Sequence, residues 1–175
     1  MEQHPEGAAL EYRVSIAPFV QPELPEYTGK PRILLVDDDR DTLQALARTF
    51  KLRMPEVEVD ISGSAAEALS LIQLHEYDAI ISDIKMPGMN GIELLATVQK
   101  LMPEVPILLI TGHGTRDIAM QALEGGAYDY THKPIDRDFF LAAVRRALQT
   151  RQLLRLVREK QLALERYAHS LEGEV

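Results

Sequence analysis

Acidic side chains stand at the ends of two short apolar runs in the sequence. In RILLVDDDR the apolar run leads directly into Asp37, Asp38 and Asp39, and in YDAIISDIKMPG a second run ends at Asp83. Apolar runs of this length are typical of strands that are buried in a sheet. Two strands that both end in acid suggest that the acids belong to one site.

The elements that must position these acids follow an alternating pattern. Strand-like runs are expected at 32–36, 57–61, 79–83, 106–110 and 127–131, and helical patterns at 40–52, 64–75, 91–101 and 115–124. Strands that alternate with helices predict an α/β domain, in which helices cover both faces of a parallel sheet.

The acids meet at one edge if the sheet is doubly wound. Ligands then bind beyond the carboxyl ends of the strands, where the strand order reverses, and in the order 2-1-3-4-5 the first and third strands flank that point. Asp37, Asp38 and Asp83 would crowd together there, and their repulsion would raise at least one pKa or require a cation. Hard oxygen ligands at a water-accessible edge favour Mg²⁺. The alternative, that the acids only cap helices and solubilise loops, suits one aspartate better than three.

Two further strand ends add a hydroxyl and an ammonium group to this edge. Thr111 ends the fourth strand in LLITGHG, and Lys133 follows the fifth in YDYTHKPID. Acids, a metal, a hydroxyl and an ammonium form a pocket for a dianionic tetrahedral group, and phosphoryl transfer requires little beyond positioning and charge neutralisation. A carboxylate can itself be the nucleophile. The sequence has no GxxxxGK[ST] phosphate loop, so nucleotide hydrolysis has no support.

Four motifs resemble the receiver domains of two-component response regulators: ILLVDDD, SDIKMPGMNG, ILLITGHG and GAYDYTHKP. The resemblance covers about residues 31–150 and is nearest to transcriptional activators of the nitrogen-regulation type. It implies a flavodoxin-like, doubly wound five-stranded parallel sheet in the order 2-1-3-4-5. It also implies a phosphorylated switch that catalyses its own phosphoryl transfer, rather than an enzyme with turnover.

The resemblance assigns the phosphoacceptor and the metal ligands. Asp83 would take the phosphoryl group from the phosphohistidine of a sensor histidine kinase or a phosphotransfer protein. Mg²⁺ would be held by Asp38 and Asp83, by Asp37 through water and by the backbone carbonyl of Lys85.

The resemblance also assigns the groups that respond to the phosphoryl group. Thr111 would bond one of its oxygens, and Lys133 would contact it and hold the loop before Pro134, where the family has a cis peptide. Tyr130 would be the aromatic switch that turns inward when Thr111 moves.

Lys85 and His113 lie two residues beyond Asp83 and Thr111, at positions that influence in this family how fast water removes the phosphoryl group. Both side chains are bulky and can be cationic, so we expect a phosphorylated state that lasts minutes or longer. The alternative is that both are ordinary loop residues.

The composition narrows the location and the partners. The chain has 175 residues, a net charge of −8 and no cysteine. The charge disfavours nonspecific binding to nucleic acid, and disulfides are excluded. Apolar runs fall short of the ~20 residues of a membrane span, and no secretion signal is recognisable. We therefore expect a soluble cytoplasmic protein.

Residues 136–171 predict one long helix without Gly or Pro. Its heptad core positions are Phe140, Ala147, Leu154, Gln161 and Ala168, together with Ala143, Thr150, Val157, Leu164 and Leu171. The first half of this helix can pack on the sheet, whereas the second half, from about residue 150, has no sheet left to cover and needs a partner helix. The seam predicts a coiled coil and a homodimer through residues 140–171. The expected organisation is an N-terminal extension or linker at 1–30, a receiver domain at 31–150 and a coiled-coil extension at 151–175. Within the extension, YRVSIAPFV is a candidate for an added strand or a docking segment, and the alternative is a disordered or loosely packed stretch.

Two interpretations of the output remain open. The chain is either a fragment of a longer protein with a kinase, cyclase or transcription-activating domain, or a receiver whose output is dimerisation itself. A different class of function is a magnesium phosphohydrolase that forms an aspartyl phosphate. Such enzymes carry DxDx[TV] at the nucleophile strand, whereas Asp83 is followed by Ile84, Lys85 and Met86, so the second acid is absent.

Overall fold

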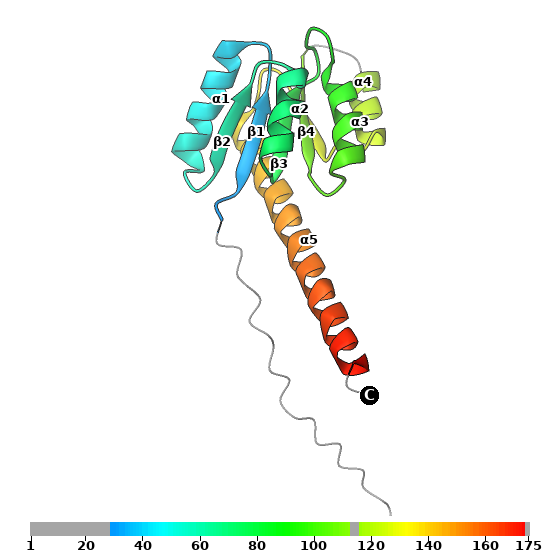
Figure 1. Ribbon diagram of the computed structural model, residues 1–175. Helices are drawn as coiled ribbons and strands as arrows, with labels where there is room; N and C mark the ends of the chain where they lie inside the picture. Colours follow the sequence, from blue (N-terminus) through cyan, green and yellow to red (C-terminus); the bar gives the residue numbers. More distant parts are fainter. Residues whose placement is uncertain (1–28, 113–115, 174–175) are drawn as a thin grey trace, which may run out of the picture.

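The computed structural model describes residues 29–112 and 116–173. In the described residues five strands and five helices alternate along the chain, and Figure 1 shows the helices packed on both sides of the sheet. The strands are β1 (Arg32–Val36), β2 (Glu58–Ser62), β3 (Ala79–Asp83), β4 (Ile107–Thr111) and β5 (Asp129–His132). The helices are α1 (Arg40–Arg53), α2 (Ala65–Leu74), α3 (Gly91–Leu101), α4 (Arg116–Glu124) and α5 (Arg137–Glu172). Every expected element is present, and its ends lie within two residues of the expected ones.

All five strands are parallel, in the order β2-β1-β3-β4-β5. This order confirms the doubly wound, flavodoxin-like α/β class. The central strands β3 and β4 are buried at every position, as apolar runs covered on both faces should be. The alternating sequence of β2 correctly predicted an edge strand, since β2 pairs only with β1.

Two apolar cores lie on the two faces of the sheet. Alternate residues of β1 divide between them: Leu34 and Val36 pack with α2, α3 and α4, whereas Ile33 and Leu35 pack with α1 and α5. In the second core the rings of Phe50 and Phe140 meet edge to face at 5.9 Å, which fixes α5 against α1. Both faces of the sheet are therefore covered by helices that pack on it.

Side-chain caps fix where the helices begin near that edge. Asp39 accepts a hydrogen bond from the backbone of Asp41 at the start of α1, and Asn90 forms a capping box with Glu93 at the start of α3. Ser64 caps α2, where its side chain accepts a hydrogen bond from the backbone N–H of Glu67. These caps start α1 and α3 immediately after the loops that carry the acids.

Helix α5 has two parts. Phe140, Ala143 and Ala147 are buried in the core of their own domain. The expected dimer range of 140–171 is therefore too long, because these three seam positions are already covered, and a partner helix can reach only the seam after Ala147. Figure 1 shows the second part of α5 continuing below the sheet. No helix in the described ranges is long and apolar enough to cross a membrane.

Candidate phosphoacceptor site

The carboxyl ends of β1, β3 and β4 bring the predicted site residues to one edge of the sheet. Asp37 directly follows β1, while Asp83 and Thr111 are the last residues of β3 and β4. All three are buried, with exposed fractions of 2%, 5% and 4%. Asp38 is exposed at the same edge. The site therefore has a buried floor and one carboxylate that faces water.

The three acids form the compact cluster that the sequence predicts. One carboxylate oxygen from each of Asp37, Asp38 and Asp83 lies within 4.8 Å of the other two. Lys133 Nζ lies 3.2 Å from Asp83 Oδ2 and 3.7 Å from Asp37 Oδ2. Within the described residues, Asp37 Oδ2 and Asp83 Oδ1 are buried and accept no hydrogen bond.

The cluster disfavours its own negative charge. Burial raises the pKa of Asp37, and the charge of Asp83 adds to this, whereas the hydrogen bond from the Asp39 backbone N–H and the charge of Lys133 lower it. Burial alone would lower the pKa of Lys133, but the charges of Asp37 and Asp83 outweigh it and the pKa is raised. Lys133 is therefore a fixed cation beside carboxylates that are short of positive charge.

Backbone contacts connect Lys133 to Thr111. The N–H of Lys133 donates to the carbonyl of Thr111 at 2.8 Å, and the Thr111 hydroxyl donates to the carbonyl of Gly112 at 3.2 Å. The Lys133–Pro134 peptide is cis, as the resemblance implied. Strand β4 and the loop after β5 therefore share one hydrogen-bonded junction at the site.

The remaining predicted residues lie around this junction. Tyr130 is half-buried, and its ring meets His132 edge to face at 5.2 Å. Lys85 is exposed in the loop after β3, and the roles assigned to it and to Tyr130 remain predictions. His113 lies outside the described residues, as do residues 12–20.

Gly91 supports the site but was expected only as part of a tight loop. A Cβ at this position would collide with the backbone oxygen of Asp83 and would lie 2.8 Å from the Cα of Ile84. The N–H of Gly91 also donates to the carbonyl of Ile84 at 2.8 Å. The first residue of α3 therefore rests directly on the backbone that carries Asp83. The Asn90-Gly91 pair was the only signal, and it indicates a turn rather than a backbone contact.

The donor set fits a small hard cation. It consists of carboxylate oxygens only, two of them buried without a hydrogen bond, beside an exposed carboxylate at an open edge. Mg²⁺ prefers such oxygen ligands and retains several of its waters. The acid cluster, the lysine and the threonine lie together at the switch point of a doubly wound sheet, where ligands of this class of α/β protein bind.

Residues 33–145 match the response regulator receiver domain family. The match covers more than half of the chain, which therefore belongs to this family.

The relatives are bacterial regulators. The C4-dicarboxylate transport transcriptional regulatory protein DctD of Pseudomonas aeruginosa is 38% identical over 148 residues, which are 84% of this chain and 31% of DctD. The response regulator FleR of the same organism is 40% identical over 66% of this chain and 24% of FleR. The solved structure of NtrX from Brucella abortus has a TM-score of 0.67 at 33% identity, over 74% of this chain and 29% of that one. The chain thus spans about a third of the length of these relatives or less, and they include the nitrogen-regulation type that the motifs resemble.

Proposed function

We propose that this chain is a phosphorylation-dependent switch and that Asp83 is its phosphoacceptor. The observation that carries the proposal is the position of Lys133, 3.2 Å from Asp83 and 3.7 Å from Asp37. The ammonium group lies where a phosphoryl group on Asp83 would place its charge. The donor would be the phosphohistidine of a sensor kinase or a phosphotransfer protein.

In the proposed step, an Asp83 carboxylate oxygen forms a bond to phosphorus while the bond from phosphorus to the donor's histidine nitrogen breaks. Bound Mg²⁺ would neutralise the phosphoryl oxygens, and Asp37, Asp38, Asp83 and the carbonyl of Lys85 are the groups that would hold it. The ammonium group of Lys133 stabilises the negative charge of the phosphoryl oxygens. The Thr111 hydroxyl turns from the Gly112 carbonyl to a phosphoryl oxygen, and Tyr130 moves inward into the space this leaves.

Intact mass tests this proposal directly. Incubation with acetyl phosphate and Mg²⁺ should add one phosphoryl group to the wild type and none to Asp83→Asn. The exposed acid Asp117 of α4 serves as the control, because Asp117→Asn leaves the site unchanged and should be labelled like the wild type. Labelling of Asp83→Asn, or no labelling of the wild type, would refute the proposal.

A second assay, with a generic phosphate ester as the substrate, separates the switch from a magnesium phosphohydrolase. A generic phosphate ester should give at most one stoichiometric labelling of the switch, whereas an enzyme would release phosphate over many turnovers. We expect no turnover, because the position two residues after Asp83 is Lys85 instead of the second acid.

We further propose the organisation 1–30 extension, 31–150 receiver and 151–175 coiled-coil extension, with a second copy of the chain as the partner. Support comes from the exposed seam residues Leu154, Val157, Leu164 and Leu171, here called the apolar stripe, with exposed fractions of 42%, 61%, 61% and 52%. Mass by light scattering, with and without beryllofluoride and Mg²⁺, should show a dimer that responds to beryllofluoride in the wild type and does not respond in Asp83→Asn. A monomer under all conditions would refute the homodimer.

A further inference from the structure

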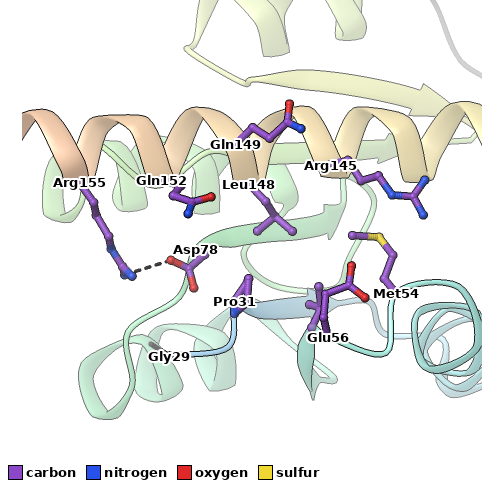
Figure 2. Close-up of a pocket in the computed structure, with 11 residues that line it drawn as sticks. Gly29, Pro31, Met54, Glu56, Asp78, Arg145, Leu148, Gln149, Gln152 and Arg155 are labelled. Carbon is purple, nitrogen blue, oxygen red and sulfur yellow. Dashed lines mark ion pairs between the residues drawn. The ribbon is translucent and has the colours of Figure 1, made fainter. Parts of the chain in front are cut away.

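Apolar packing between α5 and the sheet ends near Leu148. Below this residue a cavity of about 320 Å³ separates the helix from the start of β1 and from the loop after α1. Figure 2 shows Leu148, Gln149 and Gln152 above the cavity and Pro31 and Glu56 below it. The apolar core therefore does not hold the helix in its next turns.

Three arginines hold the helix where the apolar packing stops. A guanidinium nitrogen of Arg155 lies 3.0 Å from Asp78 Oδ1. Glu104 Oε2 lies 3.1 Å from Arg151 Nη1 and 3.3 Å from Arg158 Nη1. The spacings of four and three residues put all three arginines on one side of α5. This side faces the receiver, and its partners belong to the loops that precede β3 and β4.

Asp78 is the most firmly held of these partners. It is 5% exposed, its Oδ2 accepts a hydrogen bond from the N–H of Arg32 at 2.8 Å, and its own N–H donates to the carbonyl of Arg32 at 2.7 Å. The side chain of Arg155 is 14% exposed. Figure 2 shows the pair bridging the gap between α5 and the start of β3. Removing one charge from such a shielded pair leaves the other without compensation.

We propose that Asp78 and Glu104, with Arg151, Arg155 and Arg158, form a latch that fixes the direction and the rotation of α5 below the sheet. The latch turns the arginine side of the helix toward the receiver, so Val157, Leu164 and Leu171 of the apolar stripe face away from it and Leu154 lies at the border between the two sides. We also propose that this latch couples phosphorylation of Asp83 to the pairing of two α5 helices, and this part of the proposal rests on the function proposed above. Asp78 immediately precedes β3, which ends in Asp83, and α5 follows the loop that carries Lys133, so both sides of the latch connect to the site.

Hydrogen exchange tests the latch without any phosphorylation. In Asp78→Asn, which retains an oxygen to accept from Arg32, and in Arg155→Gln, amides of residues 149–160 should exchange about tenfold faster than in the wild type. The double variant should exchange no faster than Arg155→Gln, because that change already removes the ion pairs of Arg155 with Asp78 and with Glu76, whose Oε2 lies 3.7 Å away. Arg166→Gln, on the exposed part of the same helix, is the control and should leave these amides unchanged. Unchanged exchange in Arg155→Gln would overturn the latch.

Light scattering tests the coupling. Arg155→Gln should be labelled at Asp83 like the wild type, since it lies outside the site, which also shows that the receiver is folded. In the wild type the dimer dissociation constant should change with beryllofluoride, and in Arg155→Gln this change should shrink to less than about twofold. A full response in Arg155→Gln would overturn the coupling. No response in the wild type would contradict the proposed dimer output instead, and hydrogen exchange would still decide whether the latch exists.

Discussion

Asp37 is buried, which disfavours its negative charge, and its carboxylate lies where it can bind a cation. Its pKa is raised by burial and by the charge of Asp83, so ionisation is less favourable in the folded protein than in the unfolded chain. Its contribution to stability is full below the ordinary value of 3.8 and is lost as the pH rises through the raised pKa. Without metal, the site should therefore destabilise the fold at neutral pH.

We expect Asp37→Asn to stabilise the metal-free protein. The amide oxygen can still accept the hydrogen bond from Asp39, while the buried charge is gone, so the free energy of unfolding at pH 7 should rise by about 1 kcal/mol. Urea unfolding in the presence of a chelator measures this change. The gain should disappear below the ordinary pKa of 3.8, where Asp37 of the wild type is neutral in both states. A loss of stability at pH 7 would contradict this account.

Sequence reasoning reached most of the site residues because each one stands at a strand end, and parallel strands bring those ends together. Asp37, Asp38, Asp83 and Lys133 were placed in this way, and the structure brings all four together. Gly91 was missed, because its contact with the Asp83 backbone joins two segments whose distance no periodicity encodes.

Gly91→Ala tests this contact. The added methyl group would meet backbone atoms, which cannot rotate away, so we expect a loss of about 1–3 kcal/mol in the free energy of unfolding. Gly63→Ala is the matched control, because the nearest atom to its added Cβ would be a side-chain oxygen of Glu67 at 3.7 Å. Both variants are compared by urea unfolding. Equal effects at Gly91 and Gly63 would show that the contact is unimportant.

At the scale of elements, α5 shows what a heptad pattern encodes and what it does not. The pattern correctly predicted one uninterrupted helix of 36 residues. The heptads alone do not separate seam positions that pack in the receiver, such as Phe140, from exposed ones such as Val157, and it was the expected length of the sheet that placed the change near residue 150. Apolar residues look alike in both cases, and only the end of the sheet decides where one use gives way to the other.

The apolar stripe can be tested by one substitution and its control. Leu164→Lys places a charge in the proposed seam, so dimerisation should weaken at least about tenfold, which corresponds to about 1.4 kcal/mol. Leu162→Lys makes the same chemical change on the arginine side of the helix, where the exposed fraction of Leu162 is 43%, and should have little effect. Sedimentation velocity over a concentration series measures both. A weaker dimer in Leu162→Lys than in Leu164→Lys would show that the dimer seam lies on the arginine side of the helix, and would contradict the proposed stripe.

At the scale of the whole molecule, the alternation of strands and helices predicted the α/β class, whereas the strand order came from the resemblance to receiver domains. The uninterrupted apolar runs at 33–36 and 107–110 correctly indicated strands buried on both faces, and the alternating residues of β2 indicated an edge. The charged contacts of α5 could not be predicted, because Arg155 and Asp78 are far apart in the sequence and arginines on a long helix usually face solvent.

The two ends of the described fold leave on the same side. Strand β1 starts at Arg32 and α5 continues beyond the sheet, both at the edge opposite Asp83 (Figure 1). A bulky globular tag attached after Val175 would therefore hang below the molecule and leave the upper surface open to a visiting donor. The tagged protein should be labelled by acetyl phosphate at the same rate as the untagged chain. A domain attached at the end of α5 can therefore be exchanged without a change at the carboxyl edge of the sheet.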